Sequence, residues 1–204
     1  MRKSKADTAE TRKRILATAA NVFLQQGISG TAISDVMVAA GLTQGAFYRH
    51  FESKDHLVAE SMRAAFEEVF AALEQATVGH PSKDAIGIVV NRYLNQHFAS
   101  GQGALCPLAH LSSELRLAAD QVKLAAVEGH ARFVRFIASY LMRLDYADYL
   151  GLAESIVSVL VGAVAIASLS QAPKASEAVL VNARKTVAEM LDDAAASASR
   201  AAPH

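Results

Sequence analysis

Apolar residues recur at intervals of three and four along almost the whole chain, which is the spacing of one face of an α-helix. The first such segment begins with Asp7 or Thr8 as a cap, has Glu10 placed to complete a capping box, and ends at Gly27. Its apolar positions are Ile15, Leu16, Ala19, Val22 and Phe23. No alternating apolar and polar run between turn signals predicts a strand. The pattern therefore predicts an all-α protein.

Turn signals and capping residues divide the rest of the chain into further helices. A second helix is expected from Thr31 to Gly41, a third from Gln44 to about His50, and a long fourth helix after the cap Ser53. The others are expected at residues 82–99, 107–117, 120–144, 148–170 and 175–195. The sequence thus predicts about nine helices, with a three-helix domain in residues 1–53 and a larger helical bundle in residues 54–204.

The longest uncharged stretch, residues 155–173, is predicted to be a buried or interfacial helix. Its apolar part, residues 156–169, is interrupted by Ser158, Gly162 and Ser168, and its roughly 14 residues are fewer than the ~20 that a membrane span needs. The charged amino-terminal segment is not followed by the apolar region of a secretory signal. We therefore expect a cytoplasmic protein without membrane contact.

Charge and composition narrow the class of protein. Residues 1–54 hold eight Lys or Arg and four acidic residues, whereas the remainder is acidic by the same margin, so the chain is neutral overall. This asymmetry favours a polyanionic partner at the amino-terminal end. An apolar content of 52% excludes a disordered chain, and a single cysteine excludes a disulfide framework or a cysteine-rich zinc module.

The most informative stretch is T-A-I-S-D-V-M-V-A-A-G-L-T-Q-G-A-F-Y-R-H-F-E-S-K, residues 31–54. Two short helices joined at Gly41, which can take a positive φ, have the outline of a helix-turn-helix. Thr43 is expected to cap the second of them, and its small residues and side-chain donors suit a close approach to a groove and its phosphates. These residues are Gln44, Gly45, Ala46, Tyr48, Arg49 and His50.

The run F-Y-R-H-F at residues 47–51, followed by E-S-K at 52–54, resembles the end of the helix-turn-helix in the TetR family of bacterial transcriptional regulators. T-R-x-x-I-L-x-x-A at residues 11–19 and F-x-x-x-G at 23–27 are similar to the first helix of that family. The resemblance covers about residues 8–60. It implies a three-helix DNA-binding domain that precedes a helical domain for ligand binding and dimerisation.

The resemblance also implies roles for individual residues. Lys54 would hold a phosphate, Thr31 would contact the DNA backbone, and Phe47 and Phe51 would belong to the core. Ser34 stands where some relatives have an arginine that reads a base, so few direct base contacts are expected and the basic arm (Arg2, Lys3, Lys5) is a further candidate. The groove-facing set would comprise Thr43, Gln44, Gly45, Ala46, Tyr48, Arg49 and His50.

The last two helices are predicted to form the interface of a homodimer. A two-fold dimer presents two reading helices to a palindromic site on double-stranded DNA, its operator. Residues 156–169 are apolar nearly all round, and small residues such as Gly151, Ser155, Ser158, Gly162 and Ala165 permit close helix packing. The last helix adds Ala178, Val179, Val181, Val187, Met190 and Leu191, which suits a four-helix bundle as in the family. The alternative is that both helices are intramolecular core.

Aromatic, methionine and polar residues at helical spacing are candidates for lining the pocket of a small organic effector. Plain core packing is the alternative for each of them. They are Met62, Phe66 and Phe70 on the fourth helix, Tyr93 and His97 on the next, Cys106 and His110 on the sixth, and Phe133 and Ile137 on the seventh.

Cys106 permits three interpretations. His110, four residues later, could favour its thiolate and make it an electrophile or redox sensor. The same pair with Glu114 and His97 could bind a metal. The third interpretation is an inert, buried thiol.

The sequence as a whole predicts a transcriptional regulator, most simply a repressor that a small ligand releases from DNA by tilting the fourth helix. No resident metal or cofactor is expected. A small helical enzyme is the rival from another class, but no nucleotide-binding, nucleophile-elbow or metalloprotease motif is present. An architectural DNA binder without sequence preference is the third possibility.

Overall fold

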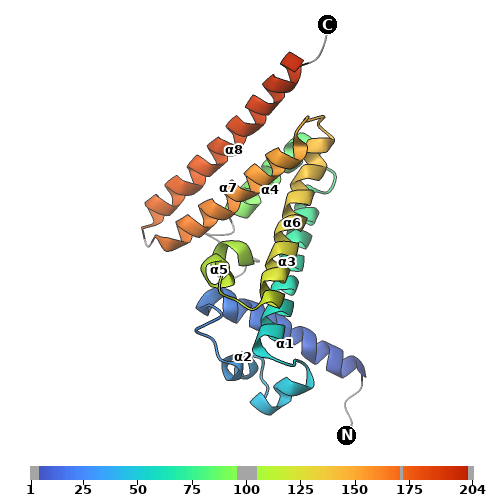
Figure 1. Ribbon diagram of the computed structural model, residues 1–204, viewed down its shortest axis with the longest axis vertical. Helices are drawn as coiled ribbons and strands as arrows, with labels where there is room; N and C mark the ends of the chain where they lie inside the picture. Colours follow the sequence, from blue (N-terminus) through green and yellow to red (C-terminus); the bar gives the residue numbers. More distant parts are fainter. Residues whose placement is uncertain (1–4, 96–104, 171, 202–204) are drawn as a thin grey trace. The chain divides into compact units, whose positions relative to one another are not determined.

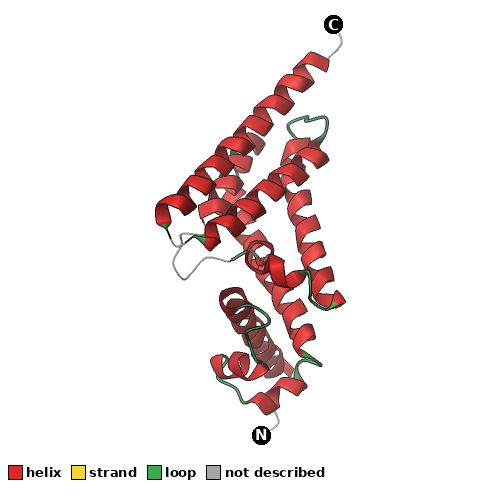
Figure 2. Ribbon diagram, turned by 60° about the vertical axis from the view of Figure 1, so that its left-hand side comes forward, coloured by secondary structure: helices red, strands yellow, loops and turns green. Residues whose placement is uncertain are grey.

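The computed structural model describes residues 5–95, 105–170 and 172–201, and these residues are all helical or in connections, with no strand among them (Figure 1, Figure 2). This confirms the all-α prediction. The helices are α1 (Lys5–Gln26), α2 (Ile33–Ala39), the 3₁₀ helix η1 (Gln44–Arg49), α3 (Lys54–Thr77), α4 (Ser82–Asn95), α5 (Pro107–Leu115), α6 (Asp120–Met142), α7 (Tyr149–Leu169) and α8 (Pro173–Ala201).

The chain forms two compact units. The first unit comprises residues 1–68 and 106–129, and the second unit comprises residues 69–105 and 130–204, within the described ranges. Both α3 and α6 run through a boundary between units. The predicted division of the chain at residue 54 coincides with the start of α3, and as a division into functional domains it stays a prediction.

Several helix ends differ from those expected. The first helix begins at Lys5, so Asp7 lies inside its first turn, where a carboxylate suits the helix dipole. The third helix is a 3₁₀ helix, with Ala46 N–H donating to the Thr43 carbonyl at 3.0 Å, which is typical of so short a segment. Thr43 does precede it, but the Thr43 hydroxyl makes no capping hydrogen bond. The last helix continues to Ala201, beyond the end expected at residue 195, through a segment rich in alanine, the residue that most favours helix.

The core of the first unit is built where α1, α2, η1 and α3 meet. Phe47 and Phe51 are buried and stack on each other with ring centroids 5.7 Å apart. They share this core with apolar residues at the helical spacing read from the sequence, namely Ile15, Ala19, Phe23, Val36, Met37 and Leu57. Burying two phenylalanines stabilises the unit by roughly 3–6 kcal/mol and fixes η1 against its neighbours.

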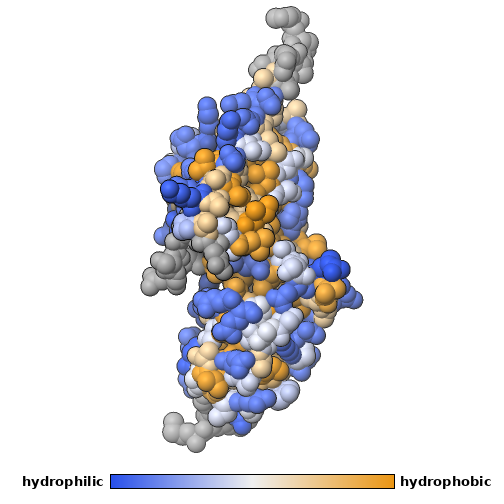
Figure 3. Space-filling view, turned by 90° about the vertical axis from the view of Figure 1, so that its left-hand side faces the viewer, coloured by the Kyte–Doolittle hydropathy of each residue, from blue (hydrophilic) through white to orange (hydrophobic). Residues whose placement is uncertain are grey.

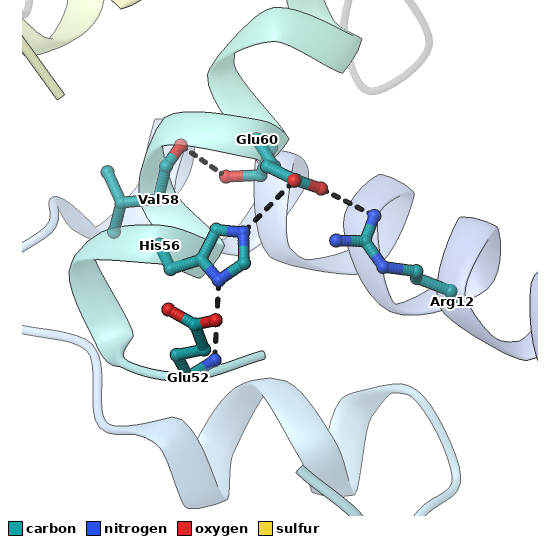
Figure 4. Close-up of polar contacts among 6 residues, drawn as sticks. Arg12, Glu52, His56, Val58 and Glu60 are labelled. Atoms are coloured by element: carbon teal, nitrogen blue, oxygen red, sulfur yellow. Dashed lines mark hydrogen bonds and ion pairs between the residues drawn. The ribbon is translucent and has the colours of Figure 1, made fainter. Parts of the chain in front are cut away.

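A polar network next to this core ties α1 to the start of α3 (Figure 4). The Arg12 guanidinium lies 4.7 Å from the centroid of the Phe51 ring and 2.5 Å from a carboxylate oxygen of Glu60. The other Glu60 oxygen lies 3.0 Å from His56 Nε2, and His56 Nδ1 accepts the Glu52 N–H at 3.3 Å. Because Nδ1 accepts, the network assigns the ring proton to Nε2, which donates to Glu60. The predicted cap is confirmed here, since Ser53 Oγ accepts the His56 N–H at 3.1 Å.

The second unit is dominated by the pairing of α7 with α8, with α4 packed against both (Figure 1). Ser176 is buried at the start of α8 and donates its hydroxyl to the Ala167 carbonyl of α7 at 2.9 Å. A second buried bond joins the Tyr140 hydroxyl of α6 to Thr77 Oγ1 of α3 at 2.9 Å. The first bond therefore links α8 to α7, and the second links α6 to α3.

Among the described residues, Tyr149–Ala167 of α7 forms one helix long and apolar enough to cross a membrane. The apolar length read from the sequence was therefore too short. The packing of α7 supports a core helix instead, because Ala153, Ile156, Val157, Leu160 and Val164 are buried within the unit.

The contact between Arg12 and Glu60 makes a prediction about stability and pH. The Arg12 hydrogen bond, helped by His56 and opposed by burial, holds the pKa of Glu60 below its ordinary value of 4.5. A carboxylate with a lowered folded pKa stabilises the protein above its unfolded pKa, and this contribution is lost as the pH falls through the folded value. We expect Glu60→Gln to lower the free energy of unfolding by about 1 kcal/mol at neutral pH, as measured by urea unfolding.

The difference in free energy of unfolding between the native chain and Glu60→Gln should shrink below pH 4.5, where Glu60 becomes protonated in the native chain. Glu10→Gln removes an exposed carboxylate from α1 and should change stability by less than about 0.5 kcal/mol. A Glu60→Gln deficit that stays constant down to the acid limit of the transition would contradict this assignment.

Candidate nucleic-acid interface

The turn between α2 and η1 has the geometry that the sequence predicted. Gly41 has φ +70°, and its N–H donates to the Val38 carbonyl at 2.9 Å. Leu42 N–H donates to the Met37 carbonyl at 2.8 Å, which completes a Schellman end for α2. The turn therefore sets η1 at a fixed angle to α2, as a helix-turn-helix requires.

One side of η1 is buried and the other faces water. Phe47 has no exposed surface, whereas the neighbouring Tyr48 is 70% exposed and rests edge-on against the Phe47 ring at 5.1 Å. Thr43, Gln44, Gly45 and Arg49 are exposed, and Ala46, His50 and Ser34 are half-buried. The predicted groove-facing residues of α2 and η1 are thus all exposed or half-buried in the first unit.

Thr31 and Lys54 make hydrogen bonds within the first unit that the sequence did not predict. Thr31 is buried, and its hydroxyl donates to the Gly27 carbonyl at 2.7 Å. Its side chain supports the loop after α1 and is not available to a DNA backbone. Lys54 is half-buried and donates from Nζ to the Ile28 carbonyl at 2.6 Å, so one of its three donors is used inside the unit.

Three residues at or near this surface were not predicted to support it; Asp35 and Val38 were not singled out from the sequence, and Glu114 was named only as a possible metal ligand. Asp35 accepts the Ala32 N–H at 2.9 Å and a weaker hydrogen bond from Ser34 Oγ at 3.4 Å, so it closes the first turn of α2. A side-chain acceptor three residues into a helix is a recognisable capping signal that could have identified it. Val38 is 73% exposed beside the Gly41 turn. The third is Glu114 of α5.

Glu114 contacts the loop that follows α1. Its carboxylate accepts the N–H of Ile28 at 3.1 Å and that of Ser29 at 2.6 Å. Burial acts to raise the pKa of Glu114, but the hydrogen bonds from Ser29 and Ile28 and the nearby Lys54 charge outweigh it and hold the pKa below 4.5. Glu114 is therefore ionised at neutral pH.

The predicted effector residues fall in both units. In the second unit Phe133 lies 5.0 Å from Tyr93 and 6.0 Å from Phe70 between ring centroids, with Ile137 buried on the same helix. In the first unit Met62, Phe66 and Cys106 are buried, and a Cβ on Gly129 would collide with the Phe66 ring. His97 lies outside the described residues.

Two cavities among the described residues are lined by residues other than the predicted effector set. One in the first unit, of about 430 Å³, lies among Ile28, Ser29, Lys54, Asp55, Glu114 and the start of α6. One in the second unit, of about 660 Å³, lies among Lys83, Asp145, Tyr146 and the carboxyl-terminal part of α8. Burial and the Asp192 carboxylate raise the pKa of Tyr146 beside the latter.

The surroundings of Cys106 give no support to a metal site. His110 Nδ1 lies 3.1 Å from the Cys106 carbonyl oxygen, so the ring contacts the backbone of that residue. Within the described ranges no three His, Cys, Asp or Glu side chains are grouped to hold a metal ion.

Comparison with known proteins first identifies the amino-terminal part of the chain, which contains the helix-turn-helix. Residues 15–61 match the family model described as bacterial regulatory proteins, tetR family. The repressor BepR of Brucella suis biovar 1 (strain 1330) is 39% identical over 83 residues, 40% of each chain. The repressor DhaR of Mycobacterium sp. (strain GP1) is 32% identical over 118 residues, 55% of this chain and 56% of DhaR. The alignments thus span less than two thirds of these curated relatives.

Solved structures extend the likeness to most of the chain. A TetR transcriptional regulator from Chloroflexus aurantiacus superposes with a TM-score of 0.77 at 25% identity, over 90% of this chain and 96% of that one. The reduced form of Escherichia coli NemR superposes with a TM-score of 0.75 at 23% identity, over 86% and 96%. BepR, DhaR and the Chloroflexus aurantiacus protein are named as transcriptional repressors or regulators, in agreement with the prediction of a regulator and against that of an enzyme. The helix-turn-helix of this chain thus matches that of the tetR family of bacterial regulatory proteins, and its fold is that of solved TetR regulators.

Proposed function

We propose that this protein is a sequence-specific DNA-binding transcriptional regulator that reads its operator with the exposed side of η1. The observation that supports this most is the division of η1 between the buried Phe47 and the exposed Gln44, Tyr48 and Arg49. Gln can bond the N6/N7 edge of adenine, while Tyr and Arg suit phosphates and guanine. His50, directly after η1, and Lys54, at the start of α3, are half-buried, and two of the three Lys54 donors are not used by its bond to the Ile28 carbonyl.

Charge supports the same surface. The positive balance lies in residues 1–54, which include the helix-turn-helix, and the rest of the chain is acidic. Cationic side chains that neutralise phosphates release counterions, so binding weakens as salt rises. A regulator with this distribution is attracted to DNA through its amino-terminal end.

We propose that the regulator is a homodimer joined through α7 and α8. Figure 3 shows apolar side chains gathered over this pair, in the upper half of the view. Ile166, Leu169 and Val181 are 57%, 82% and 51% exposed, although the two helices are otherwise well packed on each other. A Cβ at Gly162 would meet nothing within 4 Å in the single chain, so a second helix can approach there. The occupant that suits a two-fold operator is a second copy.

The regulator is further proposed to be a cytoplasmic repressor that a small organic effector releases. The names of BepR and DhaR describe repressors, which supports this direction of control. Phe70, Tyr93 and Phe133 form the aromatic cluster in the second unit where an effector would compete with core packing. The alternative of sensing through Cys106 predicts that N-ethylmaleimide changes operator affinity, and unchanged affinity would exclude it.

Arg49 provides the test of DNA binding. We expect Arg49→Ala to weaken binding to duplex DNA and to reduce the slope of log K against log salt by about 1, because one phosphate contact is lost. Fluorescence anisotropy with a labelled duplex measures both quantities. Arg135→Ala removes an exposed arginine from α6, in the part of the second unit the structure describes, and should leave the slope unchanged. Equal slopes for both variants would argue against η1 as the contact surface.

Gly162 provides the test of the dimer. A Cβ added at Gly162 in α7 or at Gly87 in α4 would have no neighbour within 4 Å, so a side chain can leave the backbone at either position without a clash at its first carbon. We expect Gly162→Leu to shift the protein from dimer to monomer in sedimentation velocity, because the side chain separates the paired helices. Gly87→Leu should stay dimeric. A native chain that sediments as a monomer, or a Gly162→Leu variant that remains dimeric, would contradict this interface.

A further inference from the structure

The loop between α1 and α2 owes its conformation to partners outside both helices. Ile28 donates its N–H to Glu114 of α5 and accepts a hydrogen bond from Lys54 of α3 on its carbonyl oxygen, at 3.1 and 2.6 Å. Ser29 donates its N–H to the second oxygen of Glu114 at 2.6 Å. Backbone groups in such a loop need partners, and here α3 and α5 supply them.

The Glu114 carboxylate is fitted to this loop. Each of its oxygens accepts one backbone N–H, and bonds to an ionised acceptor are stronger than neutral ones. Gly27 has φ +81°, and a Cβ there would press against the same carboxylate. The position therefore needs glycine for two reasons, its backbone conformation and the approach of Glu114.

The charged groups around Glu114 come from two elements. Lys54 and Asp55 at the start of α3 line the same cavity of the first unit as Glu114. His110 lies one turn earlier on α5, where its Nδ1 contacts the Cys106 carbonyl. Lys54 is the cation among these groups that favours the ionised form of Glu114.

The loop leads directly into α2 and η1, whose exposed residues form the proposed DNA-reading surface. The Thr31 hydroxyl bonds back to the Gly27 carbonyl, and α2 begins two residues later, at Ile33. The Schellman turn then fixes η1 to α2. A shift of residues 28–29 therefore moves α2 and η1 together relative to α1.

We propose that Glu114 is a positioning residue for DNA binding: it holds the α1–α2 loop so that η1 lies in its reading orientation, and loss of the Glu114 contact lowers operator affinity. This inference rests on the proposed function. It means that α5, through Glu114, holds the α1–α2 loop together with α3, which contributes Lys54. The full-length protein serves for every test.

The first test compares Glu114→Gln with Glu128→Gln. Glu128 pairs with Arg63 on the surface of the same unit, so its variant also removes one negative charge and one polar contact. We expect Glu114→Gln to bind its selected operator about tenfold more weakly than Glu128→Gln, with equal binding to an unrelated duplex at low salt. Operator affinities within twofold of each other would overturn the proposal.

Gly27→Ala breaks the same contact without changing the charge. Gly79→Ala places alanine at a comparable φ, +77°, in the turn after α3, where a Cβ meets nothing within 4 Å. Backbone strain is thus matched, and operator affinity should fall in Gly27→Ala alone. Equal affinities would count against a role for Glu114.

A spectroscopic test needs no DNA. In the native chain labelled with ¹⁵N-isoleucine and ¹⁵N-serine, the amide proton shifts of Ile28 and Ser29 should move together with a midpoint below pH 4.5, as Glu114 is protonated. The Glu114→Gln variant should lack this step. A native chain without the step overturns the contact itself. A native chain that shows the step but does not discriminate between duplexes rejects the proposed function and leaves the contact standing.

Discussion

The reading surface depends on the burial of Phe47 and Phe51. Phe47 lies within a six-residue 3₁₀ helix that is too short to be stable by itself, and Phe51 follows two residues after its end. Their removal from water determines which side of η1 packs inward. Tyr48 and Arg49, which stand between them, are consequently held in water. The hydrophobic effect thus orients polar groups that it does not itself bury.

Polar contacts then join this reading surface to longer helices. Arg12 lies against the Phe51 ring and pairs with Glu60, so α1 and α3 meet at the aromatic core. The loop that precedes α2 is hydrogen-bonded to α3 through Lys54 and to α5 through Glu114. Both α3 and α6 continue into the second unit, so α3, which holds Lys54 and Glu60, also supplies residues to the unit where an effector is proposed to bind.

The sequence predicted what local physics decides. Helical periodicity placed the helices to within a few residues, and Gly27 and Gly41, expected as helix stops, have the positive φ that such ends require. The Ser53 cap and the buried positions of Phe47 and Phe51 also follow from local signals and the family resemblance. The reading surface could not be completed in this way. Glu114 lies 86 residues from its partner Ile28, and no spacing rule links the two. The internal hydrogen bonds of Thr31 and Lys54 could not be predicted either. The direction of a polar side chain depends on acceptors, such as the Gly27 and Ile28 carbonyls, that only the fold brings near.

Selection of bound duplexes from a random pool tests the central claim most directly, that a paired reading surface built on η1 recognises a defined DNA site. The account predicts enrichment of one palindromic sequence whose two halves are centred about one helical turn, or a multiple of it, apart. Enrichment of a single unrepeated motif would contradict the pairing. A pool that stays random at a salt concentration where the protein still binds would contradict sequence-specific reading.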